Sequence, residues 1–115
     1  TLQNLEIINQ VTRTHFPDLK IIFTLPVGRM STFSQMSAFN AYSIQNATLR
    51  AALFEFLAAR HGDARLHYFP AYELVSQFFT DPFRSDNVHA SSFVTGKLCA
   101  SFSEMFCATS SAIRT

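Results

Sequence analysis

The chain has 115 residues, of which 48% are hydrophobic and 15% charged, and its net charge is +1. This composition is typical of one globular domain with a core, and it excludes a disordered chain. The weak net charge, with no basic or acidic block, argues against a nucleic-acid partner, and no apolar run approaches the roughly 20 residues that a membrane-spanning helix needs.

The first part of the chain predicts a helix and then a strand. Apolar residues at helical spacing predict a helix over residues 2–14. Residues 19–25 are rich in β-branched side chains and end at Pro26, which favours a buried parallel strand. Residues 28–43 lack a clean period, so we expect a long loop with a short helix at most.

The middle of the chain repeats this order. Asn46 is expected to cap a second helix that ends near Gly62, where glycine suits the position after the last turn. Residues 65–69 predict a second short strand, closed by Pro70, and residues 72–79 predict a short helix.

The last part predicts a turn region and one more helix. Asp81 and Pro82 open the turn region, and Ser91 or Ser92 is expected to cap a final amphipathic helix. The small, polar residues 108–115 are expected to fray.

The order helix, strand, helix, strand, helix favours an α/β fold with parallel strands. Two strands alone do not make a stable parallel sheet, because its faces and edges need partners. We therefore expect a partial three-layer α/β/α sandwich. It would form a single domain over residues 1–115, the C-terminal part of a larger domain, with possible association through an unpaired sheet edge. The chain starts at Thr1 without Met, so we expect it to be cut from something longer.

The cysteines and histidines indicate no metal site. On one helix, Cys99 and Cys107 would lie about 12 Å apart along the axis, too far for a disulfide. We expect buried free thiols, which favours a reducing compartment such as the cytoplasm. His15, His61 and His67 form no ligand cluster, and the glycines are isolated. We therefore expect no metal and no cofactor.

An acid precedes a histidine by three residues in Asp86-Asn87-Val88-His89-Ala90-Ser91. In hydrolytic triads a carboxylate orients the imidazole, which takes the proton of the nucleophile. The alternative is that Asp86 caps a turn and His89 is a solvated loop residue.

A second segment, His67-Tyr68-Phe69-Pro70-Ala71-Tyr72-Glu73, makes the pattern more specific. With the strand end Phe23–Val27, the Tyr42-Ser43 pair before Leu49–Ala52, and the segment Arg84–Ser91, the chain resembles the C-terminal part of the GSCFA family over residues 19–106. That family is related to the SGNH/GDSL hydrolases, three-layer α/β enzymes whose final D-x-x-H block carries the catalytic Asp and His.

The resemblance implies a serine ester hydrolase, an acyl esterase acting on a small-molecule or carbohydrate ester. Asp86 and His89 would be catalytic, and Tyr72, Glu73 and Ser43 would bind substrate. For Tyr72 and Glu73 the alternative is structural, with the tyrosine in the core and the glutamate capping or pairing.

The chain also departs from the family pattern. Leu25 stands where the family has serine, Ile44 where it has lysine and Ala90 where it has proline. The Gly-Ser-Cys-Phe-Ala motif is absent, so the nucleophilic serine is expected upstream of Thr1. The alternative function is a non-catalytic α/β module that binds a ligand or a partner subunit.

Overall fold

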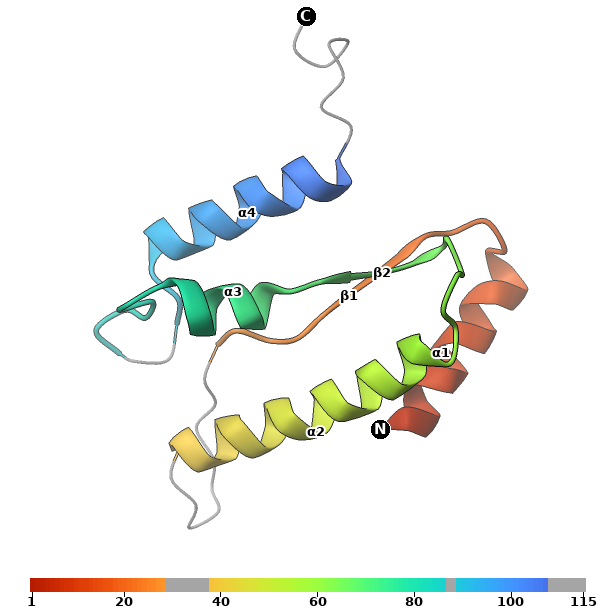
Figure 1. The fold of residues 1–115 in the computed structure, drawn as a ribbon, viewed down its shortest axis with the longest axis horizontal. Coiled ribbons are helices and arrows are strands. Elements are labelled where there is room, and N and C mark those ends of the chain that lie inside the picture. Colours follow the sequence, from red (N-terminus) through yellow and green to blue (C-terminus); the bar gives the residue numbers. More distant parts are fainter. Residues whose placement is uncertain (29–37, 87–88, 108–115) are drawn as a thin grey trace, which may run out of the picture. The chain divides into compact units, whose positions relative to one another are not determined.

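The computed structural model describes residues 1–28, 38–86 and 89–107 (Figure 1). The chain divides into two compact units. The first unit comprises Thr1–Pro26 and Met30–Phe69, and the second comprises Val27–Arg29 and Pro70–Thr115. Each unit is described by itself below.

The first unit is a strand–helix–strand element preceded by a helix (Figure 1). Its elements are α1 (Leu2–His15), β1 (Ile21–Thr24), α2 (Ala38–Ala58) and β2 (Leu66–Phe69). The two strands pair in parallel, with Ile21 opposite Leu66 and Thr24 opposite Phe69. The Thr24 hydroxyl donates to the carbonyl of Phe69 at 2.8 Å and ties the carboxyl ends of the strands together. The predicted α/β class with parallel strands is confirmed.

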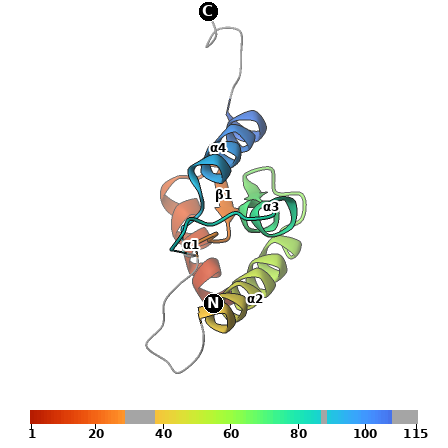
Figure 2. The same ribbon diagram turned by 90° about the vertical axis from the view of Figure 1, so that its left-hand side faces the viewer.

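Helix α1 packs against α2 in the first unit (Figure 1, Figure 2). It ends just before Phe16 and Pro17, as expected, because a residue that precedes proline disfavours helical backbone. Its apolar residues do not all face this contact: Ile7, Ile8 and Val11 remain about half exposed. Several polar residues of α1 are partly buried instead, so the buried side of the helix carries polar residues as well as apolar ones.

Helix α2 begins at Ala38, so the prediction that Asn46 caps it is wrong. Asn46 lies inside the helix and is 1% exposed, and its side-chain amide donates to the carbonyl of Tyr42 at 3.0 Å. A polar residue thus occupies a core position of the helical stripe, which interrupts the apolar period. The end of the expected loop is therefore helix, and residues 29–37 lie outside the described residues.

The core of the first unit centres on Phe56 of α2, which is fully buried. Its ring meets that of Phe23 on β1 edge to face, with centroids 5.5 Å apart. The guanidinium of Arg60 lies 4.1 Å from the centroid of the same ring, and this arginine also pairs with Glu6 of α1. One ring therefore links the crossover helix to the sheet, and a cation links it to α1.

Asp63, in the turn between α2 and β2, joins several elements of the first unit. It pairs with Arg13 of α1 at 3.2 Å and with Arg65 at 3.2 Å. Arg65 in turn donates to the carbonyl of Pro17 at 2.8 Å. Hydrogen bonds from the side chain and backbone of Arg65 hold the pKa of Asp63 below its ordinary value of 3.8.

The turn after α2 carries Gly62 at φ 92°, a conformation that side chains disfavour. The prediction that the helix ends near Gly62 is wrong, because α2 ends at Ala58 and Gly62 lies in the turn that follows.

The second unit holds α3 (Ala71–Phe78) and α4 (Ser92–Phe106), which contact each other. Val75 of α3 and Val94 of α4 are each 1% exposed, and the rings of Phe79 and Phe93 meet edge to face.

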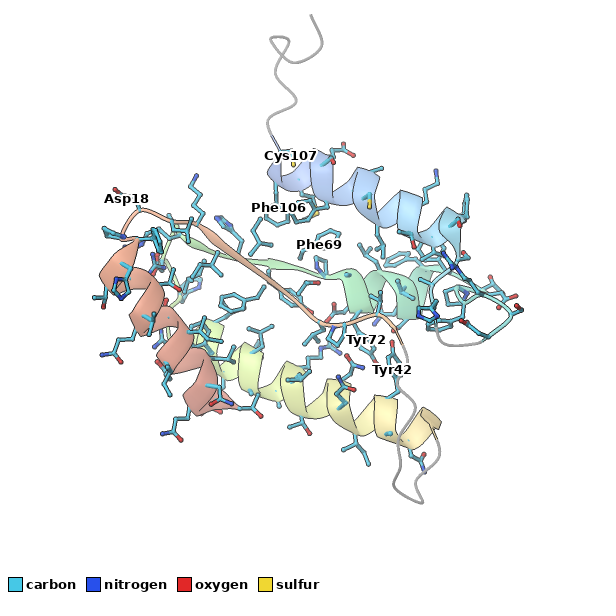
Figure 3. All side chains as sticks on the ribbon, turned by 180° about the vertical axis from the view of Figure 1, so that it is seen from behind. Asp18, Tyr42, Phe69, Tyr72, Phe106 and Cys107 are labelled. Carbon is cyan, nitrogen blue, oxygen red and sulfur yellow. The ribbon has the colours of Figure 1, made fainter. Side chains whose placement is uncertain are left out.

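The prediction of buried cysteines is wrong, because Cys99 and Cys107 are both exposed. Figure 3 labels Cys107. Val94, Leu98 and Phe102 follow each other at four-residue spacing along the inward side of α4. Cys99, one residue beyond Leu98, is rotated about 100° away from that side.

Within the described ranges, we find no helix with the length and apolar character needed to cross a membrane.

Candidate active site

The Asp86 and His89 side chains meet directly in the second unit. The carboxylate oxygen Oδ2 of Asp86 lies 2.6 Å from the imidazole Nδ1 of His89. The other oxygen, Oδ1, accepts the backbone N–H of His89 at 3.1 Å. One carboxylate therefore holds both the ring and the main chain of the same histidine.

This contact fixes where the imidazole carries its proton. An ionised carboxylate only accepts hydrogen bonds, so the Nδ1 atom of His89 must be the donor. In the neutral ring Nε2 is then the basic nitrogen, available to take a proton. Among the described residues, Asp86 is the one side chain that bonds the ring.

The pair is open to solvent, with 69% of the His89 side chain and 45% of the Asp86 side chain exposed. Exposed ion pairs contribute little to stability, because water screens them. The pairing of Asp86 with His89 therefore contributes little to the folding energy.

A short backbone ladder closes the loop that carries the pair. Phe83 and Ala90 form an antiparallel bridge. The Arg84 N–H donates to the carbonyl of His89 at 2.7 Å, and the Ser91 N–H donates to the carbonyl of Pro82 at 2.8 Å. These bonds hold the two ends of the loop, residues 82–84 and residues 89–91, against each other.

Ser91 caps α4, which confirms one of the two caps predicted from the sequence. Its hydroxyl oxygen accepts the N–H of Val94 at 3.3 Å. Ser92, the other candidate, is the first residue of the helix and is exposed. The histidine therefore lies just ahead of a capped helix.

Tyr72 and Glu73, the predicted substrate-binding residues, lie in the first turn of α3 (Figure 3). Both are half-buried, in the short helix that the sequence predicts over residues 72–79, and α3 begins directly after Pro70. Glu73 suits this place, since a carboxylate near a helix N-terminus is favoured by the helix dipole.

Ser43, the third predicted substrate-binding residue, is exposed on α2 in the first unit. The expected loop setting for Ser43 is wrong, because α2 begins five residues earlier, at Ala38.

The described residues contain no group of three His, Cys, Asp or Glu side chains placed to hold a metal ion.

The sequence did not indicate the roles of Pro82 and Arg84, which act through the main chain. Arg84 and Pro82 bond His89 and Ser91 by their peptide groups, which leave no side-chain signature. Many residue types satisfy such peptide hydrogen bonds, so no sequence signal would have found them.

Comparison with known families agrees with these motifs. The GSCFA family model matches residues 1–102. The chain belongs to the GSCFA family. Searches of the curated proteins and of the solved structures gave no match.

Proposed function

We propose that this GSCFA chain is the C-terminal part of a serine ester hydrolase with a three-layer α/β/α fold of the SGNH type. The substrate class we propose is an acyl ester, carried by a carbohydrate or another small molecule. In this proposal His89 is the general base, Asp86 orients it, and the nucleophilic serine comes from a segment outside this chain.

The observation that carries the proposal is the 2.6 Å contact between Asp86 Oδ2 and His89 Nδ1. It leaves Nε2 as the basic nitrogen. In the proposed first step Nε2 takes the hydroxyl proton of the serine while the serine oxygen bonds to the acyl carbon. The protonated ring then gives that proton to the departing alcohol, and the acyl-serine remains for hydrolysis by water.

The exposure of His89 supports the same proposal. A base that serves a serine from another segment must present Nε2 outside its own loop, and 69% of this side chain is exposed. We also propose that Tyr72, Glu73 and Ser43 contact the substrate.

The test is ester hydrolysis by the full-length protein, measured with p-nitrophenyl acetate. We expect His89→Ala to lower kcat/KM by about 10²–10⁴-fold, the usual contribution of a general base. Asp86→Asn should lower kcat and leave KM nearly unchanged, because the amide no longer fixes the proton on Nδ1. The matched control is His61→Ala, which removes an exposed histidine after α2.

The second candidate function is a non-catalytic binding module. One observation favours it: Asp86 Oδ1 accepts the backbone N–H of His89 at 3.1 Å, as an aspartate that only caps a turn would. Equal ester hydrolysis by wild type and His89→Ala would support this candidate over the hydrolase.

A further inference from the structure

The main chain on both sides of His89 is held by the opposite stem of its loop. The carbonyl of His89 accepts from the Arg84 N–H at 2.7 Å. Two residues later, the Ser91 N–H donates to the carbonyl of Pro82 at 2.8 Å. The direction in which the imidazole leaves the backbone therefore depends on this ladder.

Ser91 is the residue at which the ladder joins α4. Its N–H belongs to the ladder, while its hydroxyl oxygen accepts the Val94 N–H at 3.3 Å and its carbonyl accepts the Thr95 N–H at 2.9 Å. Its backbone is extended, with φ −64° and ψ 159°, as an N-cap requires. Val94 is 1% exposed, so the N-terminus of α4, which Ser91 caps, packs in the interior of the second unit.

The packing around the His89 ring is sparse. With 69% of the His89 side chain exposed, few packing contacts restrict its rotation. A catalytic group needs its geometry held to a fraction of an ångström by the surrounding structure. Here that structure is the loop and its junction with α4.

We propose that Ser91 is a positioning residue for His89. Its side chain locks the extended backbone that lets its N–H close the ladder, and the closed ladder holds the imidazole against Asp86. This inference rests on the proposed hydrolase function for its use, but the geometry that it predicts exists without substrate.

The test is the tautomer of His89, read by nitrogen NMR of the full-length protein labelled in its histidine rings, with His89→Gln assigning the signals. At alkaline pH, where imidazoles are neutral, we expect wild-type His89 to carry its proton on Nδ1. In Ser91→Ala we expect the signal to move toward the mixture of tautomers that free histidine shows. In ester hydrolysis, kcat should fall about ten-fold to a hundred-fold, the scale of a misplaced catalytic group, with KM nearly unchanged.

Three further variants separate positioning from stability. Ser91→Thr keeps a capping hydroxyl and should keep the wild-type tautomer. Ser91→Gly caps the helix almost as well as serine but has no hydroxyl, so it should fold and still lose the tautomer preference. Ser92→Ala is the matched control, since it removes the neighbouring exposed hydroxyl and should change nothing.

The wild-type tautomer in both Ser91→Ala and Ser91→Gly would overturn the inference, and so would a wild-type His89 protonated on Nε2. A tautomer that depends on Ser91 in a protein without esterase activity would leave the positioning role standing and reject the proposed hydrolase. Esterase activity that requires His89 but not Ser91 would support the proposed hydrolase and reject the positioning role of Ser91.

Discussion

Different kinds of interaction stabilise each of the two compact units. In the first unit a fully buried ring, Phe56, packs against Phe23, and a charged cluster around Asp63 joins α1 to the turn before β2. In the second unit the proposed catalytic pair, Asp86 and His89, is exposed, and peptide hydrogen bonds hold its loop.

We therefore expect substitutions in the two units to change different properties of the protein. Burial and ion pairing in the first unit provide folding energy, so substitutions there should lower the stability of the protein. The exposed pair contributes little to folding, so substitutions there should change activity at nearly constant stability. The predictions below test that separation, starting with the largest effect.

Phe56→Ala should cause the largest loss of stability. Removing a fully buried ring leaves a cavity and costs about 3–5 kcal/mol in the free energy of unfolding. The matched control is Phe54→Ala, two residues away on α2, where the ring is 74% exposed and the change should stay within about 0.5 kcal/mol. Urea unfolding measures both, and equal losses would contradict the assignment of the core.

Asp63→Asn should lower Tm at neutral pH, because it removes the carboxylate that Arg13 and Arg65 share. The folded-state pKa of Asp63 lies below its ordinary value of 3.8, so its contribution to stability is present above that value. The contribution is lost as the pH falls through the folded-state pKa.

The gap in Tm between wild type and Asp63→Asn should therefore close on acidification, in a series of thermal melts. Asp18→Asn, which changes an exposed aspartate between α1 and β1 (Figure 3), is the control and should alter stability by less than about 0.5 kcal/mol. A gap that persists unchanged at acid pH would contradict a role for the charge.

Replacing either of two glycines by alanine should give the smallest changes in stability, one destabilising and the other stabilising. Gly62→Ala forces a side chain into φ 92° and should cost about 1–2 kcal/mol, although no atom lies within 4 Å of the added carbon. Gly96→Ala, inside α4 and equally free of clashes, should stabilise by about 0.5–1 kcal/mol, because alanine favours helix. Thermal melts with changes of the same sign would contradict these backbone assignments.

Much of the local structure was predictable because it follows from side-chain periodicity and capping. The end of α1 before Pro17, the parallel strands and the Ser91 cap all leave such signals. The start of α2 was not predictable in this way, because the buried Asn46 interrupts the apolar stripe and resembles a cap.

The sequence indicated the side chains of the candidate site, but not the backbone hydrogen bonds that hold its loop. The spacing of Asp86 and His89 predicts their contact, which the structure has at 2.6 Å. The ladder between Arg84 and His89 depends on backbone pairing, which many residue types satisfy. No side-chain pattern could therefore reveal it.

The most direct test of the central claim is covalent labelling of the full-length protein with a fluorophosphonate, read by intact mass. Wild type should gain one adduct on a serine, and His89→Ala should lose it, because the base that activates the serine is gone. A serine labelled equally in His89→Ala would contradict the role of His89, and no adduct in wild type would favour the binding module.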